Sequence, residues 1–295
     1  MTRSMTACAR LSQNSSRNRL LKNPSSNPCK NVMSSSTLNE EGNRLFQQGR
    51  YGEALSYYQQ ALDLDRRTGN PWELAATLGN LANVYASIGK KKEALTCYRE
   101  VLGIHRKLGD IRVVGVTLAN MGNLHADRHE IEQAKAHYLE AIDLLEPSGD
   151  IRGLGMLYGN LALAVRDEGD LSSAIGHFEK AIRHLRKLGD SPELARTINS
   201  LGKTYWMQGQ LDKALGRSEE ALAISRRLGD ELGMAAAWYN LVAVNEGLGR
   251  AEAAIDLLER VVAIDEKYHL PKLNENRMRL DRLRQSRKGG THVQS

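Results

Sequence analysis

The sequence predicts an all-α protein built from stacked helical hairpins. Two observations support this: the segment at residues 78–117 recurs with a period of 40 residues, and small residues fall at the same positions of successive copies. A fixed period of this size indicates a solenoid, in which each unit buries its apolar face on its neighbours. The expected copies are residues 38–77, 78–117, 118–157, 158–197, 198–237 and 238–270.

Three columns of the repeat predict the hairpin. Two of them hold small residues twelve positions apart, where paired helices would touch closely. The third lies between them, where a turn joining antiparallel helices needs a residue free to adopt positive φ. The small columns are Gly42, Ala82, Gly122, Ala162, Gly202, Val242 and Ala54, Ala94, Ala134, Ala174, Ala214, Ala254, and the turn column is Gly49, Gly89, His129, Gly169, Gly209, Gly249.

A second recurring motif, of three residues, separates one hairpin from the next. It reads Leu-Gly-Asp in three copies and Thr-Gly-Asn or Ser-Gly-Asp in two others. Glycine commonly ends a helix, and a following Asp or Asn can accept hydrogen bonds from the first free N–H groups of the next helix. The expected N-cap residues are Asn70, Asp110, Asp150, Asp190 and Asp230.

The two ends of the chain lack this repeat. Residues 1–37 are rich in Ser, Asn and Arg without apolar periodicity, which predicts a disordered basic tail. After the last copy, Pro271 can open an amphipathic helix over residues 271–287, whose apolar side would cap the array. Residues 288–295 are expected to form a disordered tail. The apolar residues of the capping helix are Leu273, Leu280 and Leu283.

The net charge of +6 is located at the termini. The first 38 residues carry six basic and no acidic residues, and residues 272–295 carry seven basic and two acidic residues. The repeats between them hold 28 basic and 33 acidic residues. Nucleic-acid binding would therefore depend on the ends of the chain, and it is the least favoured of the functions considered.

Composition also bears on the compartment. Three cysteines without a metal or redox pattern indicate a reducing environment, and no apolar run approaches the roughly 20 residues of a membrane-spanning helix. We expect a soluble, cytoplasmic protein. Residues 1–36 loosely match an organellar transit peptide, but a plain tail, or a true start at Met33, is favoured.

Catalytic motifs are absent from the sequence. It contains no phosphate-binding glycine loop, no nucleophile elbow and no HExxH motif. His125, His129 and His137 could in principle bind a metal, but His125 occupies a core aromatic column and His129 replaces a turn glycine. We expect neither a cofactor nor enzymatic activity.

The columns resemble the tetratricopeptide repeat (TPR) over residues 38–270. The residues that carry the resemblance in the second copy are Leu81, Ala82, Tyr85, Gly89, Ala94 and Tyr98. The 40-residue period is similar to that of the Pins/LGN scaffold proteins, kinesin light chains and bacterial TPR regulators. The resemblance implies a right-handed superhelix whose first helices line a concave groove, and a scaffold or adaptor that binds a partner peptide or helix there.

The resemblance also implies which residues face that groove. A column of asparagines would hold the backbone of a bound peptide, and bulkier residues of the last copies would offer further contacts. The alternative is that each asparagine bonds the preceding hairpin and that Trp206 packs on the next one. The expected peptide-binding residues are Asn43, Asn80, Asn83, Asn120, Asn123, Asn160, Arg196, Asn199, Lys203, Trp206, Tyr239 and Asn240.

Two departures from related grooves narrow the expected ligand. The carboxylate clamp of chaperone-binding TPR domains needs Lys and Arg where this chain has Asn39, Val116 and Asn120. An Arg-dense groove is also missing, so an amphipathic peptide with an apolar anchor towards the C-terminal half fits best. Self-assembly through the array ends or swapped tails, giving a homo-oligomer, is the alternative from a structural class.

Overall fold

The structure is a computed structural model that describes residues 33–290, with side chains through Ser286. The chain divides after Ser34 into two units. The predicted disordered tails at residues 1–37 and 288–295 lie mostly outside the described residues. Within residues 33–290 there are thirteen α-helices, one short 3-10 helix and no strand.

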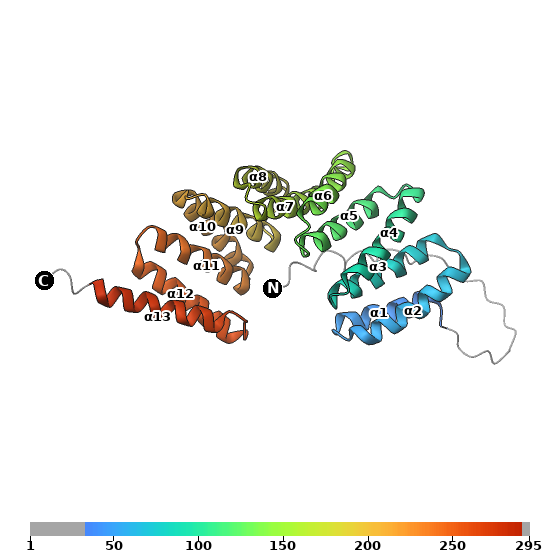
Figure 1. Cartoon of the computed structure of the whole chain (residues 1–295), viewed down its shortest axis with the longest axis horizontal. Coiled ribbons are helices and arrows are strands. Elements are labelled where there is room, and N and C mark those ends of the chain that lie inside the picture. Colours follow the sequence, from blue (N-terminus) through green and yellow to red (C-terminus); the bar gives the residue numbers. More distant parts are fainter. Residues whose placement is uncertain (1–32, 291–295) are drawn as a thin grey trace. The chain divides into compact units, whose positions relative to one another are not determined.

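Twelve of the helices pair in chain order as six antiparallel hairpins, each packed on the next (Figure 1). A thirteenth helix packs on the last hairpin. The hairpins are α1 (Ser35–Gln47) with α2 (Tyr51–Thr68), α3 (Pro71–Ser87) with α4 (Lys91–Leu108), α5 (Ile111–Ala126) with α6 (Ile131–Leu145), α7 (Ile151–Asp167) with α8 (Leu171–Arg186), α9 (Pro192–Met207) with α10 (Leu211–Leu228), and α11 (Glu231–Gly247) with α12 (Ala251–Lys267), followed by α13 (Leu273–Gly290).

The turn inside each hairpin has the predicted left-handed residue. Glycine takes it in five hairpins, with φ of 73° at Gly49 and 78° at Gly89, for example. His129 adopts φ 58° at the equivalent position of the third hairpin, although it has a Cβ that disfavours this conformation. The backbone requirement of the turn therefore holds even where glycine is replaced.

The joints between hairpins follow the predicted capping pattern with one exception. Asp150, for example, accepts a hydrogen bond from the Gly153 N–H at 3.0 Å, and Asn70, Asp110 and Asp230 act in the same way. The prediction for Asp190 is wrong. Ser191 caps α9 instead, because Pro192 fixes the first helical position and places the N-cap directly before it.

Close helix approach inside each hairpin depends on the small-residue columns. The alanine column is 0% exposed in all six hairpins. A Cβ added at Gly122 would lie 2.5 Å from the ring of Tyr138, and one at Gly42 would meet Tyr58 at the same distance. In the fifth hairpin the partner of Gly202 is Ser218 rather than a ring, and the two helices approach closely there as well.

Helix α13 covers the end of the last hairpin. Leu280 is buried against α12, and the side-chain amide of Asn276 donates to the buried carboxylate of Asp265 at 2.7 Å. Arg277 and Arg284 of this helix are exposed and pair with Glu266 and Glu259 of α12, both at 2.7 Å. The helix continues to Gly290, beyond the expected end at residue 287.

Candidate functional site

The candidate site lies on the odd-numbered helices. Several neighbouring pairs of these helices contact each other directly, namely α1 with α3, α5 with α7, α7 with α9 and α9 with α11. We call their half-exposed and exposed side that does not pack on the even helices the odd-helix face. On the central helices it comprises Ala76, Gly79, Asn80, Asn83, Val116, Ala119, Asn120, Asn123, Met156, Gly159, Asn160, Leu163, Arg196, Asn199, Lys203, Trp206, Tyr239 and Asn240.

Asparagine side chains on this face bond across hairpins. The Asn80 amide donates to the Asn39 side-chain carbonyl at 3.0 Å, and the Asn160 amide donates to that of Asn123 at 3.0 Å. The Asn240 amide donates to both the backbone and side-chain carbonyls of Asn199, at 2.9 and 2.8 Å. These contacts fix the orientation of the amides, which stay half-exposed on the face.

A second set of asparagines bonds within its own hairpin. The phenol groups of Tyr58, Tyr98 and Tyr138 donate to the side-chain carbonyls of Asn43, Asn83 and Asn123, at 2.7, 2.5 and 2.7 Å. Burial raises the pKa of Tyr58, which keeps its phenol protonated as a donor. In the last three hairpins the two columns hold other residues: Leu163 with Phe178, Lys203 with Ser218, and Ala243 with Leu258.

The row of asparagine hydrogen bonds begins at a network of side-chain hydrogen bonds between the first two hairpins, which sequence reasoning missed. Asn39 donates to the Thr77 hydroxyl at 2.6 Å, and Thr77 donates to the carboxylate of Asp65 at 2.6 Å. Asp65 is 0% exposed. The signal that could have found it is the recurrence of Asp at the equivalent position of the last hairpin, Asp265, which accepts from α13 in a similar way.

The comparisons with known proteins identify the family. A model described as "Tetratricopeptide repeat" matches residues 34–107, 113–187, 153–227 and 193–267, which together cover most of the chain. The chain belongs to the tetratricopeptide repeat family. A sequence comparison with curated proteins finds no significant match.

Solved structures share the TPR fold at low sequence identity. BtubC (BKLC) from P. vanneervenii is 21% identical over 74% of this chain and 92% of its own, with a TM-score of 0.67. A STAND protein with a tetratricopeptide repeat sensor from Pyrococcus horikoshii is 14% identical over 84% and 38%, with a TM-score of 0.73. A Rap protein complexed with Competence and Sporulation Factor is 17% identical over 87% and 76%, with a TM-score of 0.61. These likenesses show that the stacked hairpins have the fold of a TPR solenoid.

The C-terminal half of the TPR array carries the bulkier side chains of the odd-helix face. Arg196, Lys203 and Trp206 are exposed on α9. Tyr239 on α11 is half-buried, with Lys272 Nζ 5.1 Å and Arg279 Cζ 5.2 Å from the centre of its ring. The C-terminal segment therefore covers Tyr239 but leaves Trp206 open.

Arg279 is held in place by Glu246. Burial disfavours the charged guanidinium, but its hydrogen bonds to the Glu246 carboxylate and the charge of that group outweigh burial, so the pKa of Arg279 is raised. The pair fixes α13 to α11 beside Tyr239.

Over residues 33–290 no group of three or more His, Cys, Asp or Glu side chains is arranged for a metal ion.

The remaining histidine candidates have structural roles. His125 is buried and lies 2.6 Å from the Glu130 carboxylate, with its ring stacked on His137 at 5.3 Å between centroids. His129 is exposed in the turn. In the described part of the chain, no helix is both long and apolar enough to span a membrane.

Proposed function

We propose that this TPR protein is a non-enzymatic scaffold or adaptor, which binds a segment of a partner protein on its odd-helix face. The observation that carries the proposal is the row of half-exposed asparagine amides on successive odd helices. The Rap protein complexed with Competence and Sporulation Factor has a similar fold, which supports such a role. We assign the protein to the cytoplasm as part of the same proposal, from its unpatterned cysteines.

The asparagine amides suit a peptide backbone. Each primary amide has two N–H donors and one carbonyl acceptor, which matches the donor and acceptor of a peptide unit. The bonds from Asn80 and Asn160 to the preceding hairpin hold these amides in one orientation. Side chains that are already ordered lose less conformational entropy on binding. The hydrogen bonds to the preceding hairpin therefore also favour binding of a ligand to these amides.

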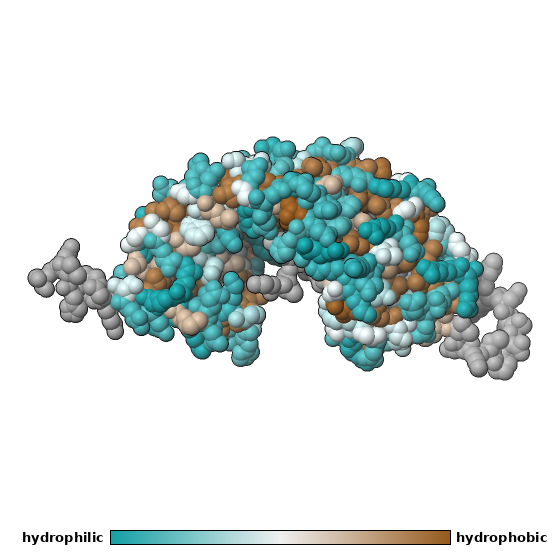
Figure 2. Space-filling view, viewed as in Figure 1, coloured by the Kyte–Doolittle hydropathy of each residue, from teal (hydrophilic) through white to brown (hydrophobic). Residues whose placement is uncertain are grey.

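The odd-helix face carries only small side chains between the asparagine amides. Ala76 and Gly79 on α3, Ala119 on α5 and Gly159 on α7 project little beyond the helix backbone. A bound segment could therefore approach closely enough for direct hydrogen bonds. The view in Figure 2 shows a largely hydrophilic surface with apolar patches between.

A pair of bulky substitutions in one hairpin tests the proposal. A Cβ at Gly79 or at Gly103 would meet nothing within 4 Å, so a side chain can begin at either position without a clash at its Cβ. Gly79→Arg would obstruct the odd-helix face, whereas Gly103→Arg would extend from the exposed side of α4. Full-length wild-type and variant proteins are immobilised, and the proteins they retain from source-cell extract are compared by quantitative mass spectrometry.

The expected result is that Gly79→Arg loses the retained partner and Gly103→Arg keeps it. Equal retention by all three proteins would place the interface elsewhere and reject the proposal. The asparagine contribution is tested separately with Asn120→Ala combined with Asn160→Ala. If circular dichroism shows an intact fold and partner affinity is unchanged, the assignment of the backbone-binding role to these residues fails.

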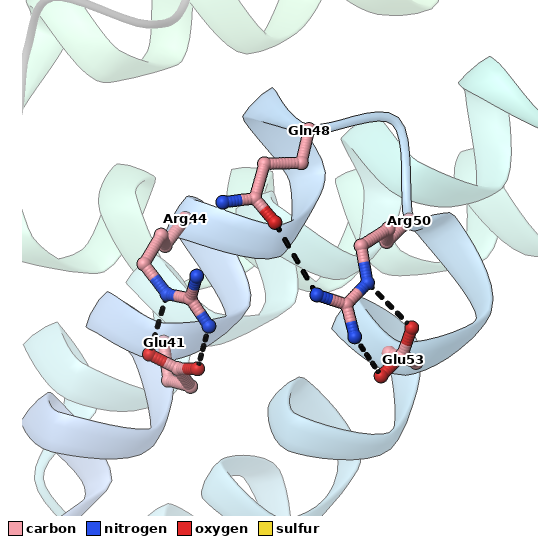
Figure 3. Close-up of polar contacts among 5 residues, drawn as sticks. All are labelled: Glu41, Arg44, Gln48, Arg50 and Glu53. Carbon is pink, nitrogen blue, oxygen red and sulfur yellow. Dashed lines mark hydrogen bonds and ion pairs between the residues drawn. The ribbon is translucent and has the colours of Figure 1, made fainter.

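The first hairpin weighs against self-assembly through that end of the array. Glu41 pairs with Arg44, and the Nε and Nη2 groups of Arg50 donate to the Glu53 carboxylate, at 2.7 and 2.6 Å (Figure 3). Because Asn39 faces α3, the 100° rotation per residue places Arg44 well away from the neighbouring hairpin. Arg44 therefore lies on the side of α1 opposite α3, and α13 covers the other end of the array. A monomeric mass over a wide concentration range would dispose of a homo-oligomer.

The nucleic-acid alternative depends on the basic residues at the two ends of the chain. The N-terminal basic residues fall within residues 1–32. At the other end Arg277, Arg279 and Arg284 each pair with a glutamate. Binding to nucleic acid that weakened steeply with added salt would revive this alternative.

A further inference from the structure

A recurring ion pair links consecutive even-numbered helices. An arginine near the end of one even helix meets a glutamate of the next even helix, 34 residues further along the chain. We call these two positions the inter-hairpin pair. The ion pair occurs at three of the five steps from one even helix to the next: Arg66 with Glu100 at 3.6 Å, Arg106 with Glu140, and Arg186 with Glu220 at 2.5 Å.

The step from α6 to α8 carries the same two charges in reverse order. Glu146 occupies the arginine position and Lys180 the glutamate position. Both contact Tyr158 of α7, whose phenol donates to the Glu146 carboxylate at 2.7 Å, while Lys180 Nζ lies 5.1 Å from the ring centre. The inter-hairpin pair therefore keeps opposite charges even where its residues are exchanged.

The last step, from α10 to α12, departs from this rule. Its two positions hold Arg226 and Arg260, so both charges are positive. Arg260 Cζ lies 5.9 Å from the ring centre of Trp238, which occupies the position of Tyr158 in the repeat. Arg260 thus takes the place of Lys180. By the same equivalence, the repeat places Arg226 beside the same ring.

The charges at this last step do not cancel. The Nε and Nη2 groups of Arg260 both donate to one oxygen of Asp256, at 3.2 and 3.0 Å. That ion pair lies within one helix and its side chains are 52% and 61% exposed, so it is weak. Arg226 is exposed, and its side chain has no hydrogen bond or ion pair within residues 33–286. The three groups together carry a charge of +1, whereas the other inter-hairpin pairs are neutral.

Two neighbouring guanidinium groups suit a carboxylate. Like charges on adjacent helices repel each other, and an anion placed between them removes that repulsion. A carboxylate can accept charge-assisted hydrogen bonds from two arginines at once. At three other steps the same arginine position already meets a carboxylate of the neighbouring helix, so the local geometry of the repeat suits this group.

We propose that the step between α10 and α12 is a second interaction site, on the even helices, which binds an acidic side chain of a partner protein. The carboxylate of the partner accepts hydrogen bonds from Arg226 and Arg260 beside Trp238. It supplies from outside the charge that a glutamate supplies at the equivalent steps. This site is separate from the odd-helix face and does not depend on the function proposed for that face.

The neighbourhood of the two arginines is tested without a ligand. Arg226→Glu would restore opposite charges, as in the reversed pair at Glu146, so its urea midpoint should lie above that of Arg67→Glu. Arg67 is an exposed arginine in the last turn of α2 and belongs to no inter-hairpin pair. Both substitutions place a glutamate in the last turn of an even helix, so their helix-dipole costs are similar. A midpoint for Arg226→Glu at or below that of Arg67→Glu would overturn the inference.

Binding is tested with the full-length protein and two short fluorescein-labelled peptides. One peptide alternates glutamate with alanine, and the other has glutamine in place of each glutamate. Fluorescence anisotropy at low salt gives the affinities. The glutamate peptide is expected to bind at least about fivefold more tightly than the glutamine peptide.

Variants then locate the contact. Arg226→Gln should weaken binding of the glutamate peptide about threefold, and Arg226→Gln combined with Arg260→Gln about tenfold, the range of exposed charge pairs. Arg67→Gln removes the same charge from another even helix and should bind as wild type. All these proteins keep the basic residues 1–32, so the difference between variants isolates the site.

The remaining outcomes are equally decisive. Equal affinity for the two peptides, or equal weakening by Arg226→Gln and Arg67→Gln, would reject the site. So would phosphatidylserine vesicles whose binding depends on Arg226 while that of the glutamate peptide does not, because the ligand would then be a membrane. Gly79→Arg, which tests the odd-helix face, should bind the glutamate peptide as wild type. The two proposals can therefore fail separately, and loss of peptide binding in Gly79→Arg would contradict a separate site on the even helices.

Discussion

The phenol of Tyr138 donates a 2.7 Å hydrogen bond to the side-chain carbonyl of Asn123, which also accepts from the Asn160 amide at 3.0 Å. One carbonyl oxygen thus joins the two helices of the third hairpin and connects that hairpin to the fourth. Asn123 was predicted as a peptide-binding residue from its column. Its carbonyl is engaged within the fold, so any ligand contact it makes must use its remaining polar groups.

Removing the Tyr138 hydroxyl tests this joint. Tyr138→Phe is expected to lower the free energy of unfolding by about 1 kcal/mol, the usual net contribution of a buried hydrogen bond. The measurement is the urea midpoint followed by circular dichroism. Tyr57→Phe, at a half-exposed position of α2, is the matched control. Equal midpoints for the two variants would show that the Tyr138–Asn123 bond does not stabilise the array.

The left-handed turn at His129 predicts opposite effects for two substitutions. His129→Gly removes the steric cost of φ 58° but adds chain entropy to the unfolded state, so a net gain of roughly 0.5 kcal/mol is expected. Gly89→Ala, at φ 78° in the preceding hairpin, should instead lose about 1 kcal/mol. Thermal unfolding of both variants checks the signs. A loss of stability in His129→Gly would mean that the imidazole itself stabilises the turn.

Because Ser191 rather than Asp190 caps α9, substitutions at these two residues should differ in their effect on stability. Asp150→Ala and Ser191→Ala should each cost about 1 kcal/mol, because each side chain accepts the first N–H groups of a helix. Asp190→Ala should cost clearly less, since Asp190 only pairs with Arg227 on the surface. Chemical unfolding of the three variants decides between them. A loss at Asp190 as large as at Asp150 would contradict the assignment of the cap to Ser191.

Two histidines stacked on Tyr158 predict that acid destabilises the fourth hairpin. The rings of His177 and His184 lie 6.3 and 5.8 Å from that of Tyr158, between centroids. Burial lowers the pKa of both histidines, and the charges of Lys180 on His177 and of Lys187 and Arg183 on His184 lower it further. Asp170 and Glu146 oppose these effects only in part.

The sign follows from the lowered pKa values. Above the ordinary histidine pKa of about 6.5, both rings are neutral in the folded and unfolded chains. As the pH falls below it, the unfolded chain takes up protons first, so stability is lost as the pH approaches the folded pKa values. The urea midpoint should therefore fall between neutral pH and pH about 5.

A non-titrating variant isolates these two rings. His177→Gln combined with His184→Gln should reduce the fall in midpoint, whereas His269→Gln, at an exposed position after α12, should leave it as in wild type. An unchanged fall in the double variant would assign the acid sensitivity to other groups.

The hairpins themselves could be predicted from local residue requirements. A positive φ inside each turn and a small side chain where helices touch are demands on single positions, so the columns of Gly49 and Ala54 display them directly. The N-cap of α9 was wrongly predicted at Asp190 because the Gly-Asp sequence there is the same as at the other joints. Ser191 and Pro192 follow it, and a proline in the first turn of the helix sets the position of the cap.

The candidate site could be predicted only as a face. The asparagine column lies on the odd helices, but which amide atoms are already bonded depends on contacts such as Asn80 with Asn39, between residues 41 apart in the chain. Tyr239 was predicted to offer an apolar contact together with Trp206, yet the two differ in exposure because Lys272 and Arg279 cover only Tyr239. Sequence columns treat equivalent positions alike and cannot show such covering.

The sequence by itself determined the repeat, the hairpin, its turns and the membership of the TPR family, because each repeat carries its own backbone and packing requirements within 40 residues. Only the tertiary structure decided which polar groups the fold has already used and which side chains remain open on α9. The physical reason is that hydrogen-bond partners and exposure are set between hairpins. There Asn123 meets Asn160, and α13 reaches Tyr239 but not Trp206.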